Sequence, residues 1–200
     1  MIKLKLYPFI LATSLLLILV WTQSDSVAQD ANTQEKVQSK KFDKKGLTFD
    51  YPDQWKIGSD ESFSGTRLVI VYGPNNAIVT IQFSEIKFAD SLEDYVKEYS
   101  ETAAAEVKKV AKLTNESLTK KSKNKFDFES ITEKFTLENG ETKIPHDRIY
   151  LRKKIDKYAC FIVCQTSTAN MEKVESGFRQ LITTIELRTK SRKSGKTDKR

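Results

Sequence analysis

The single histidine limits the acid–base chemistry that this 200-residue chain can perform. His146 precedes Asp147, and a His–Asp pair beside a serine is the arrangement that activates a hydroxyl nucleophile for hydrolysis. Because His146 follows Pro145 near the start of a strand-like segment, an exposed histidine at a strand edge is the simpler interpretation. A hydrolase that uses His146 is the third of three functional hypotheses, and we expect no catalytic residue, cofactor or metal.

Two cysteines, Cys160 and Cys164, lie in a segment rich in strand-forming residues. Residues four apart on a straight strand share a face but lie about 13 Å apart, at 3.3 Å per residue. A disulfide needs Cα atoms within about 7 Å, so the two thiols should not bond to each other. The three-residue spacer also excludes a CxxC redox site. We expect two buried structural thiols, with an intermolecular disulfide as the alternative.

Basic side chains gather at the C-terminal end of the chain. Residues 29–187 hold 25 basic and 25 acidic side chains, so most of the formal net charge of +7 comes from the end. The segment 188–200 should be disordered, because residues 191–200 include no apolar side chain. It could bind an anionic lipid, a wall polymer or a nucleic acid, or it could simply be a solvated terminus. The candidate anion-binding residues are Arg188, Lys190, Arg192, Lys193, Lys196, Lys199 and Arg200.

The first 28 residues have the three-part layout of a secretory signal peptide. Lys3 and Lys5 are followed by an apolar core, and Ser26-Val27-Ala28 places small residues before a cleavage point. The core, residues 9–21, is shorter than the roughly 20 apolar residues that a spanning helix needs. We therefore expect cleavage near Ala28 and a secreted or periplasmic protein, with an uncleaved N-terminal membrane anchor as the alternative.

The remaining sequence divides into a polar linker and one domain. Residues 29–41 are almost entirely polar and predict a flexible linker. Residues 42–187 contain strand-like segments at 47–51, 67–72, 78–86, 131–137 and 146–154, together with the cysteine segment. We interpret residues 58–65 as a loop. Turn sequences at 73–76 and 139–140 join these segments into hairpins. A reversal of apolar parity between Phe128 and Ile131 suggests a β-bulge.

Two segments have the periodicity of amphipathic helices, 91–112 and 170–185. Ser91 begins the first with a sequence that approximates a capping box. Strands grouped between well-separated helices predict an α+β fold. We expect an antiparallel sheet of about six to seven strands flanked by these two helices.

Gly46-Leu-Thr-Phe-Asp-Tyr-Pro-Asp-Gln-Trp55 resembles the opening of PsbP-like domains, and the order of elements after it is also similar. The resemblance covers roughly residues 42–187. It implies the αβα sandwich of the PsbP and Mog proteins and a generally non-enzymatic role in binding or assembly. It transfers no ligand-binding residue. Pro52 and Trp55 are expected to be structural, with Pro52 ending a strand and Trp55 packing in the core.

The first functional hypothesis is an exported, non-catalytic domain that binds an unknown protein partner at the cell envelope, with the basic tail as an electrostatic tether. The second is a secreted polyanion binder in which the tail itself is the functional element. The neutral body argues against specific nucleic-acid binding by the domain, which normally requires a basic face.

Overall fold

The computed structural model describes residues 38–86, 91–121, 128–155 and 157–188. The predicted signal peptide, most of the predicted linker and residues 189–200 lie outside these ranges. Ten strands form two sheets, and the larger sheet is antiparallel throughout. Its order is β3 (Lys56–Phe63), β4 (Thr66–Tyr72), β5 (Ile78–Glu85), β9 (Tyr158–Ser167), β8 (Thr142–Ile155), β7 (Glu129–Asn139) and β6 (Lys112–Lys121).

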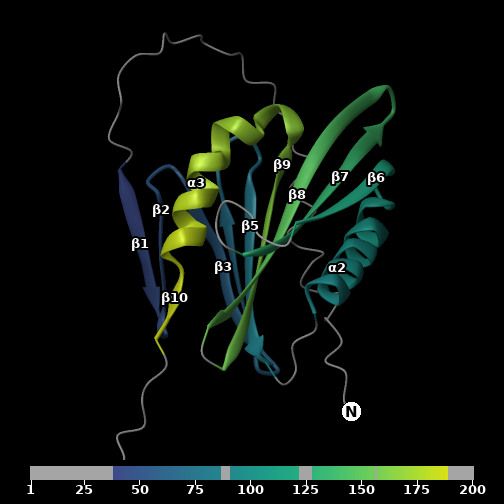
Figure 1. Cartoon of the computed structure of the whole chain (residues 1–200). Coiled ribbons are helices and arrows are strands. Elements are labelled where there is room, and N and C mark those ends of the chain that lie inside the picture. The colour runs from purple at the N-terminus through teal and green to yellow at the C-terminus, as the bar shows by residue number, and fades with distance from the viewer. Residues whose placement is uncertain (1–37, 87–90, 122–127, 156, 189–200) are drawn as a thin grey trace, which may run out of the picture.

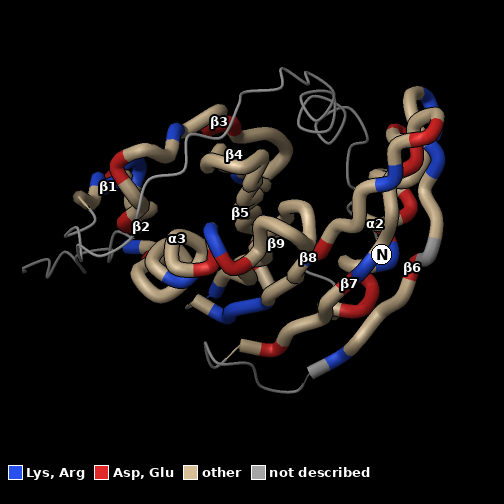
Figure 2. Tube along the Cα trace, turned by 90° about the horizontal axis from the view of Figure 1, so that it is seen from above, with Lys and Arg blue, Asp and Glu red and all other residues tan. Residues whose placement is uncertain are grey.

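The two long helices cover opposite faces of this sheet. Helix α2 (Leu92–Val107) packs against one face, and α3 (Met171–Thr184), preceded by the short 3-10 helix η3 (Thr168–Asn170), packs against the other. Figure 1 shows α3 on the left, beside β3, β5 and β9, and α2 at the lower right near β6, and Figure 2 shows the two helices on either side of β5, β9 and β8 when viewed from above. The expected α+β fold, with a large antiparallel sheet flanked by two helices, is confirmed, and the seven strands of this sheet agree with the expected six to seven.

Strand β9 forms the shared wall of the two cores. Its alternate residues Cys160, Ile162 and Cys164 belong to the core under α3, whereas Ala159, Phe161 and Val163 belong to the core under α2. Because successive strand residues point to opposite faces, a strand buried on both sides is a continuous apolar run. This explains why residues 159–164 show no alternation of polar and apolar types.

Helix α2 begins where its sequence predicts. The Ser91 hydroxyl accepts a hydrogen bond from the Asp94 amide at 3.1 Å, and Glu93 and Asp94 lie in the first turn. Both features stabilise the positive N-terminal end of a helix. The helix ends at Val107 rather than near residue 112, because Lys112 already begins β6.

A smaller sheet lies on the α3 side of the domain. It consists of β1 (Ser39–Lys44), β2 (Leu47–Pro52) and the two-residue β10 (Glu186–Leu187), with β2 in the middle. Phe42 and Phe49 stack at 4.7 Å between ring centroids and join the core under α3. Strand β1 thus begins at Ser39, inside the segment 29–41 that the sequence predicts to be a linker.

Two local predictions are wrong, each for its own physical reason. The predicted loop at 58–65 is mostly edge strand β3, whose exposed position needs no apolar pattern. The parity change between Phe128 and Ile131 is no bulge, since Phe128 joins the core under α3 and Ile131 joins the core under α2. In this sheet both faces are buried, so apolar residues of either parity are accommodated. Among the described strands, register shifts occur in β3 and in β6, which are the two edge strands.

Candidate functional site

The basic C-terminal segment begins at a fixed point on the folded domain. Strand β10 pairs with β2, and the Arg188 amide then donates a hydrogen bond to the Gly46 carbonyl at 2.8 Å. The Arg188 guanidinium contacts the Asp43 carboxylate at 2.6 Å. Arg188 is therefore held against the turn between β1 and β2. The other six candidate anion-binding residues lie outside the described residues: Lys190, Arg192, Lys193, Lys196, Lys199 and Arg200.

Trp55 is buried, as the sequence predicts. It is 2% exposed, and its ring meets Phe178 of α3 edge-on at 5.5 Å between centroids. Gly177 and Gly73 leave room for the indole, because a Cβ on either would overlap it. Pro52 is the last residue of β2, and its carbonyl accepts the Trp55 amide hydrogen at 3.0 Å. Both residues are therefore structural.

Cys160 and Cys164 are free, buried thiols on the α3 face of β9. Burial raises the pKa of both thiols well above the ordinary value. Since the thiolate is the reactive form, these cysteines are poor nucleophiles in the folded domain. The prediction of two core thiols is confirmed.

His146 and Asp147 do not form a catalytic pair. They are adjacent on β8, so their side chains leave opposite faces of the sheet. The His146 ring stacks on Phe135 at 5.4 Å, with its Nδ1 atom 3.0 Å from the Ile144 carbonyl oxygen. The Asp147 carboxylate instead accepts a hydrogen bond from Thr168 of η3 at 3.1 Å. His146 is buried, contrary to the exposed edge position expected from the sequence.

A buried polar network under α2 was not foreseen from the sequence. Arg148 lies at its centre and is 1% exposed. Its Nη1 atom donates to the Glu133 carboxylate at 2.8 Å, and its Nε atom donates to the Gln165 side-chain oxygen at 2.6 Å. The Tyr150 hydroxyl donates to the same Glu133 oxygen at 2.6 Å. Strands β7, β8 and β9 each supply part of this network.

Helix α2 covers the network and contributes two of its contacts. Ser100 donates to the second Glu133 oxygen at 2.5 Å, and the Tyr99 ring lies 5.4 Å from the Arg148 guanidinium carbon. The Phe135 ring lies 4.6 Å from the same carbon atom. Burial alone lowers the pKa of Arg148, but the neighbouring acidic groups Tyr150 and Glu133 outweigh it and raise the pKa. The guanidinium therefore stays charged beside the Glu133 carboxylate, with which it forms a buried ion pair.

Three buried polar atoms of the described residues have no hydrogen-bond partner, and all belong to the side of the sheet that α2 covers. They are the Tyr95 hydroxyl, Nη2 of Arg148 and Nε of Arg152. Buried polar groups are normally paired with protein or water. The core under α2 is therefore more polar than the core under α3. Within the described ranges, no group of three or more His, Cys, Asp or Glu side chains could hold a metal ion.

The polar alternation of β8 contained the only sequence signal for this network. Arg148, Tyr150 and Arg152 alternate with apolar residues, which is typical of a strand with one solvent-exposed face. The apolar stripe of α2 implies that this helix covers one face of the sheet. The local sequence does not show that β7 and β8 form part of the covered face.

An antiparallel sheet between two helices, with a small second sheet beside one of them, defines the architectural class. No protein-family model and no curated protein sequence matches the chain. Among solved structures, it is similar to cyanobacterial PsbP (CyanoP) from Synechocystis sp. PCC 6803, with a TM-score of 0.50 and 10% identity. The match covers 80% of this chain and 98% of that one. The chain thus has a PsbP-like fold, as its opening motif predicts.

Two other solved structures give lower scores. A Bacteroides thetaiotaomicron VPI-5482 protein has a TM-score of 0.45 at 18% identity, over 76% of this chain and 50% of that one. LpqN, described as involved in cell envelope biogenesis of Mycobacterium tuberculosis, has a TM-score of 0.34 at 9% identity, over 78% of this chain and 93% of that one. The likeness to cyanobacterial PsbP establishes the fold and assigns no functional residue.

None of the helices in the described parts of the chain has the length and apolar character needed to cross a membrane.

Proposed function

We propose that this protein is an exported, non-catalytic binding domain that engages a protein partner at the cell envelope, with its basic C-terminal segment as an electrostatic tether. The observation that carries the proposal is the anchoring of Arg188 to Gly46 and Asp43. It attaches a run of basic residues at a fixed point on a domain whose body is charge-neutral.

The positions of the reactive side chains support a binding role. His146 contacts Phe135 and a backbone carbonyl, and the two thiols are enclosed by the core under α3. The buried ion pair of Arg148 and Glu133 has a structural role, because its hydrogen bonds join residues of three strands and α2. The chemistry-bearing side chains are thus committed to packing, which leaves the surface and the tail for recognition.

The test is chemical cross-linking and co-purification from the envelope fraction, comparing the full chain with a truncation after Arg188. The truncation keeps the contacts of Arg188 with Gly46 and Asp43, so it removes charge without removing described structure. One defined protein partner recovered with both forms supports the proposal. Recovery of no defined partner by either form contradicts it.

The charge distribution favours a second candidate function, a polyanion binder acting through the tail. The tail holds seven basic groups and one acidic group in 13 residues, next to a neutral domain. In this case only diffuse anionic material is recovered with the full chain, and it is lost with the truncation. The same experiment therefore distinguishes the two functions.

A further inference from the structure

We propose that two copies of this chain associate through strand β6, which pairs antiparallel with β6 of the second copy around a two-fold axis beside Leu118. This self-association is separate from the proposed function, since it needs no other protein. We call residues 116–120 the pairing segment.

Strand β6 is an edge strand of the large sheet. It pairs with β7, and within the described residues no other strand pairs with it. Figure 2 shows β6 along the outer edge of the molecule. An edge strand presents a row of backbone N–H and C=O groups that can form hydrogen bonds with another strand. The pairing segment therefore offers main-chain hydrogen bonds to a partner strand.

Leu118 distinguishes this edge from the others. Its exposed fraction is 61%, and Val110 is the other large apolar side chain that the described residues leave exposed. Val110 lies in the connection between α2 and β6, outside any strand. Native sheets usually protect their edges with charged residues, proline or bulges rather than with an exposed apolar side chain. Leu118 therefore indicates an edge that is covered in the assembled protein.

The Leu118 side chain lies on the face of the sheet that α2 covers. Its ladder partner is Glu133, and residues directly opposite each other share a face. Glu133 in turn accepts a hydrogen bond from Ser100 of α2. Lys120 lies on the same face, two residues further along, where its ammonium group contacts the Glu93 carboxylate of α2. A second strand beside β6 would thus meet Leu118 and Lys120 on one face.

Symmetry limits the registers in which two copies of β6 can pair. A two-fold axis perpendicular to the sheet must pass beside one residue, because opposed residues share a face and faces alternate along a strand. With the axis beside Leu118, the two leucines are opposite each other and Glu116 of each copy is opposite Lys120 of the other. An axis beside Ser117 or Thr119 would place a charged residue opposite Leu118. An axis beside Glu116 or Lys120 would place two like charges opposite each other.

The local geometry of β6 is compatible with the register centred on Leu118. The register shift of β6 against β7 falls between Thr114 and Ser117, so pairing with β7 is regular from Ser117 onward. Bulges and edge lysines usually oppose pairing between sheets. Here the shift lies at the end of the pairing segment that holds Glu116, and Lys120 is opposite a carboxylate instead of a second lysine. Neither feature blocks this register.

Charge complementarity favours a second copy over an unrelated peptide. Glu116 is exposed, and the Lys120 side chain remains 64% exposed although it contacts Glu93. Because exposed ion pairs contribute little, Lys120 can share its charge between Glu93 and Glu116 of the second copy. Opposite charges across a ladder stabilise the pairing. Each copy therefore supplies the apolar residue and both charges that the other needs.

Sedimentation velocity of the exported form of the protein, over a wide range of concentrations, measures the equilibrium between monomer and dimer. The wild type should form a dimer. Lys120→Glu should raise its dissociation constant about tenfold, because two attractive pairs per dimer become repulsive. Glu116→Lys should have the same effect. Combining Glu116→Lys with Lys120→Glu exchanges the two charges and should return the constant to the wild-type value.

Three further variants test the apolar contact and provide controls. Leu118→Ser should weaken the dimer about tenfold, because the leucine pair loses its buried surface. Val110→Ser removes the other exposed large apolar side chain and should leave the dimer unchanged. Glu93→Gln removes the partner of Lys120 within the same chain and should also leave it unchanged.

Leu118→Cys tests the position of the axis directly. Two thiols beside the axis would lie opposite each other within disulfide reach, so oxidation by dissolved oxygen should link the copies. Thr119→Cys places the thiols on the other face and out of register, and these should link much more slowly. Cys160 and Cys164 are buried and should not contribute.

Three results would overturn the proposal. They are a wild type that stays monomeric at every concentration, a charge-exchanged double variant that stays as weak as the single variants, and equal losses in Val110→Ser and Leu118→Ser. None of these bears on the recovery of a protein partner from the envelope fraction, so the proposed function is judged by its own experiment.

Discussion

Arg148 and Glu133 form an ion pair that is almost completely removed from water, at 1% and 3% exposure of their side chains. Replacing a buried pair with apolar residues is often neutral, but removing one partner leaves an uncompensated charge. The pair is therefore better understood as a constraint on how α2 and three strands fit together than as a source of net stability.

The first prediction concerns this pair. Glu133→Leu should lower the free energy of unfolding by about 3–5 kcal/mol, because Arg148 keeps a buried charge without its partner. Adding Arg148→Met should restore much of that loss, which urea unfolding of the single and double variants can measure. As a control, Glu138→Gln changes an ion pair with the exposed Lys143 and should leave the free energy of unfolding nearly unchanged. If the loss in the double variant equals the sum of the losses in the two single variants, the residues are not coupled.

The second prediction concerns His146. Burial lowers its pKa below the ordinary value, so the unfolded chain takes up this proton more readily than the folded domain. The resulting stability is complete above the ordinary pKa of about 6.5 and is lost as the pH falls through the lower folded value. His146→Phe keeps an aromatic ring beside Phe135 and removes the titration. Urea unfolding from pH 7.5 to 5 should therefore show a steeper loss of stability in the wild type, and parallel slopes would contradict the assignment.

At this scale, residue types predicted packing better than they predicted polar contacts. The burial of Trp55 and of both cysteines followed from their apolar character and neighbours. The burial of Arg148 could not be predicted, because a strand with one polar face is interpreted as half-exposed unless the helix that covers that face is known.

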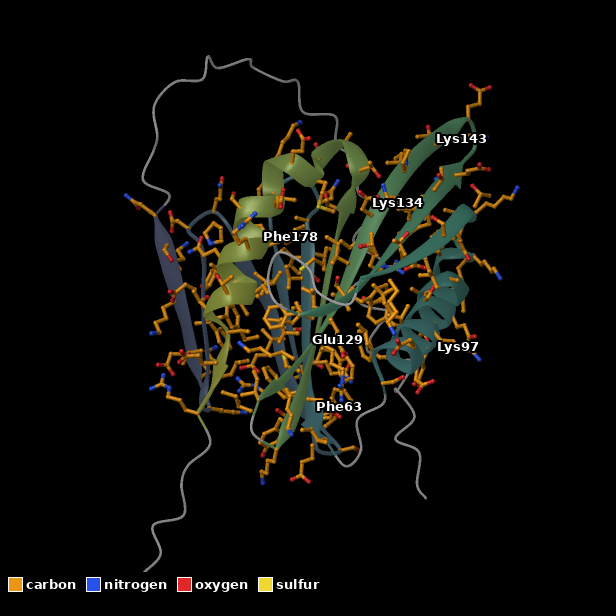
Figure 3. The ribbon with its side chains drawn as sticks, viewed as in Figure 1. Phe63, Lys97, Glu129, Lys134, Lys143 and Phe178 are labelled. Carbon is orange, nitrogen blue, oxygen red and sulfur yellow. The ribbon has the colours of Figure 1, made fainter. Side chains whose placement is uncertain are left out.

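At the scale of elements, the contact between α3 and the segment after β2 depends on a residue without a side chain. Gly177 lies in the middle of α3 against the Trp55 indole, and Phe178 beside it meets the same ring. Figure 3 shows Phe178 on α3 where that helix crosses the sheet. The glycine weakens the helix locally but permits the close approach of the indole.

The third prediction follows from this contact. Gly177→Ala should gain helix propensity but place a methyl group against the indole, with a net cost of about 1–3 kcal/mol. Ser176→Ala, on the exposed side of the same helix, should be neutral or slightly stabilising. Thermal and urea unfolding of the two variants give the comparison. A stabilised Gly177→Ala would show that the indole can move aside.

Elements with strong periodicity were predictable, and elements at edges were not. Both helices and the central strands follow from apolar spacing and turn residues, and the helix begun by Ser91 starts at the expected residue. Strand β3 was interpreted as a loop because, at an edge, it exposes polar residues on both faces. Strands β1 and β10 were missed for a related reason, since each is short and is stabilised by pairing with β2.

At the scale of the whole molecule, the fold joins the two ends of the domain. β1 and β10 flank β2, so the first and last described strands share one partner. The sequence predicted the layers and the PsbP-like fold, because these follow from the order of elements. The small sheet could not be predicted, because its closure depends on contacts between residues far apart in the chain.

The fourth prediction separates tail from domain. Truncation after Arg188 should leave the thermal midpoint unchanged, because residues 189–200 include only polar and charged side chains and one glycine. Truncation after Ile185 removes β10 and the hydrogen bond to Gly46, and should cost about 1–3 kcal/mol at about 1 kcal/mol per hydrogen bond. Scanning calorimetry of the three forms checks both expectations. A lower midpoint after the shorter deletion would mean that the tail packs on the domain.

The shared wall formed by β9 has a consequence for the protein before it folds. Residues 159–164 are a short uncharged run of strand-forming residues without proline, and such runs aggregate when they are exposed. Cys160 and Cys164 lie in that run, and the core that encloses them is complete only after α3 has packed on this face of the sheet. In an oxidising compartment, folding of the sheet within one chain would therefore compete with the formation of disulfides between the exposed cysteines of different unfolded chains. Replacing both cysteines with alanine should therefore reduce cross-linking between chains that have not yet folded.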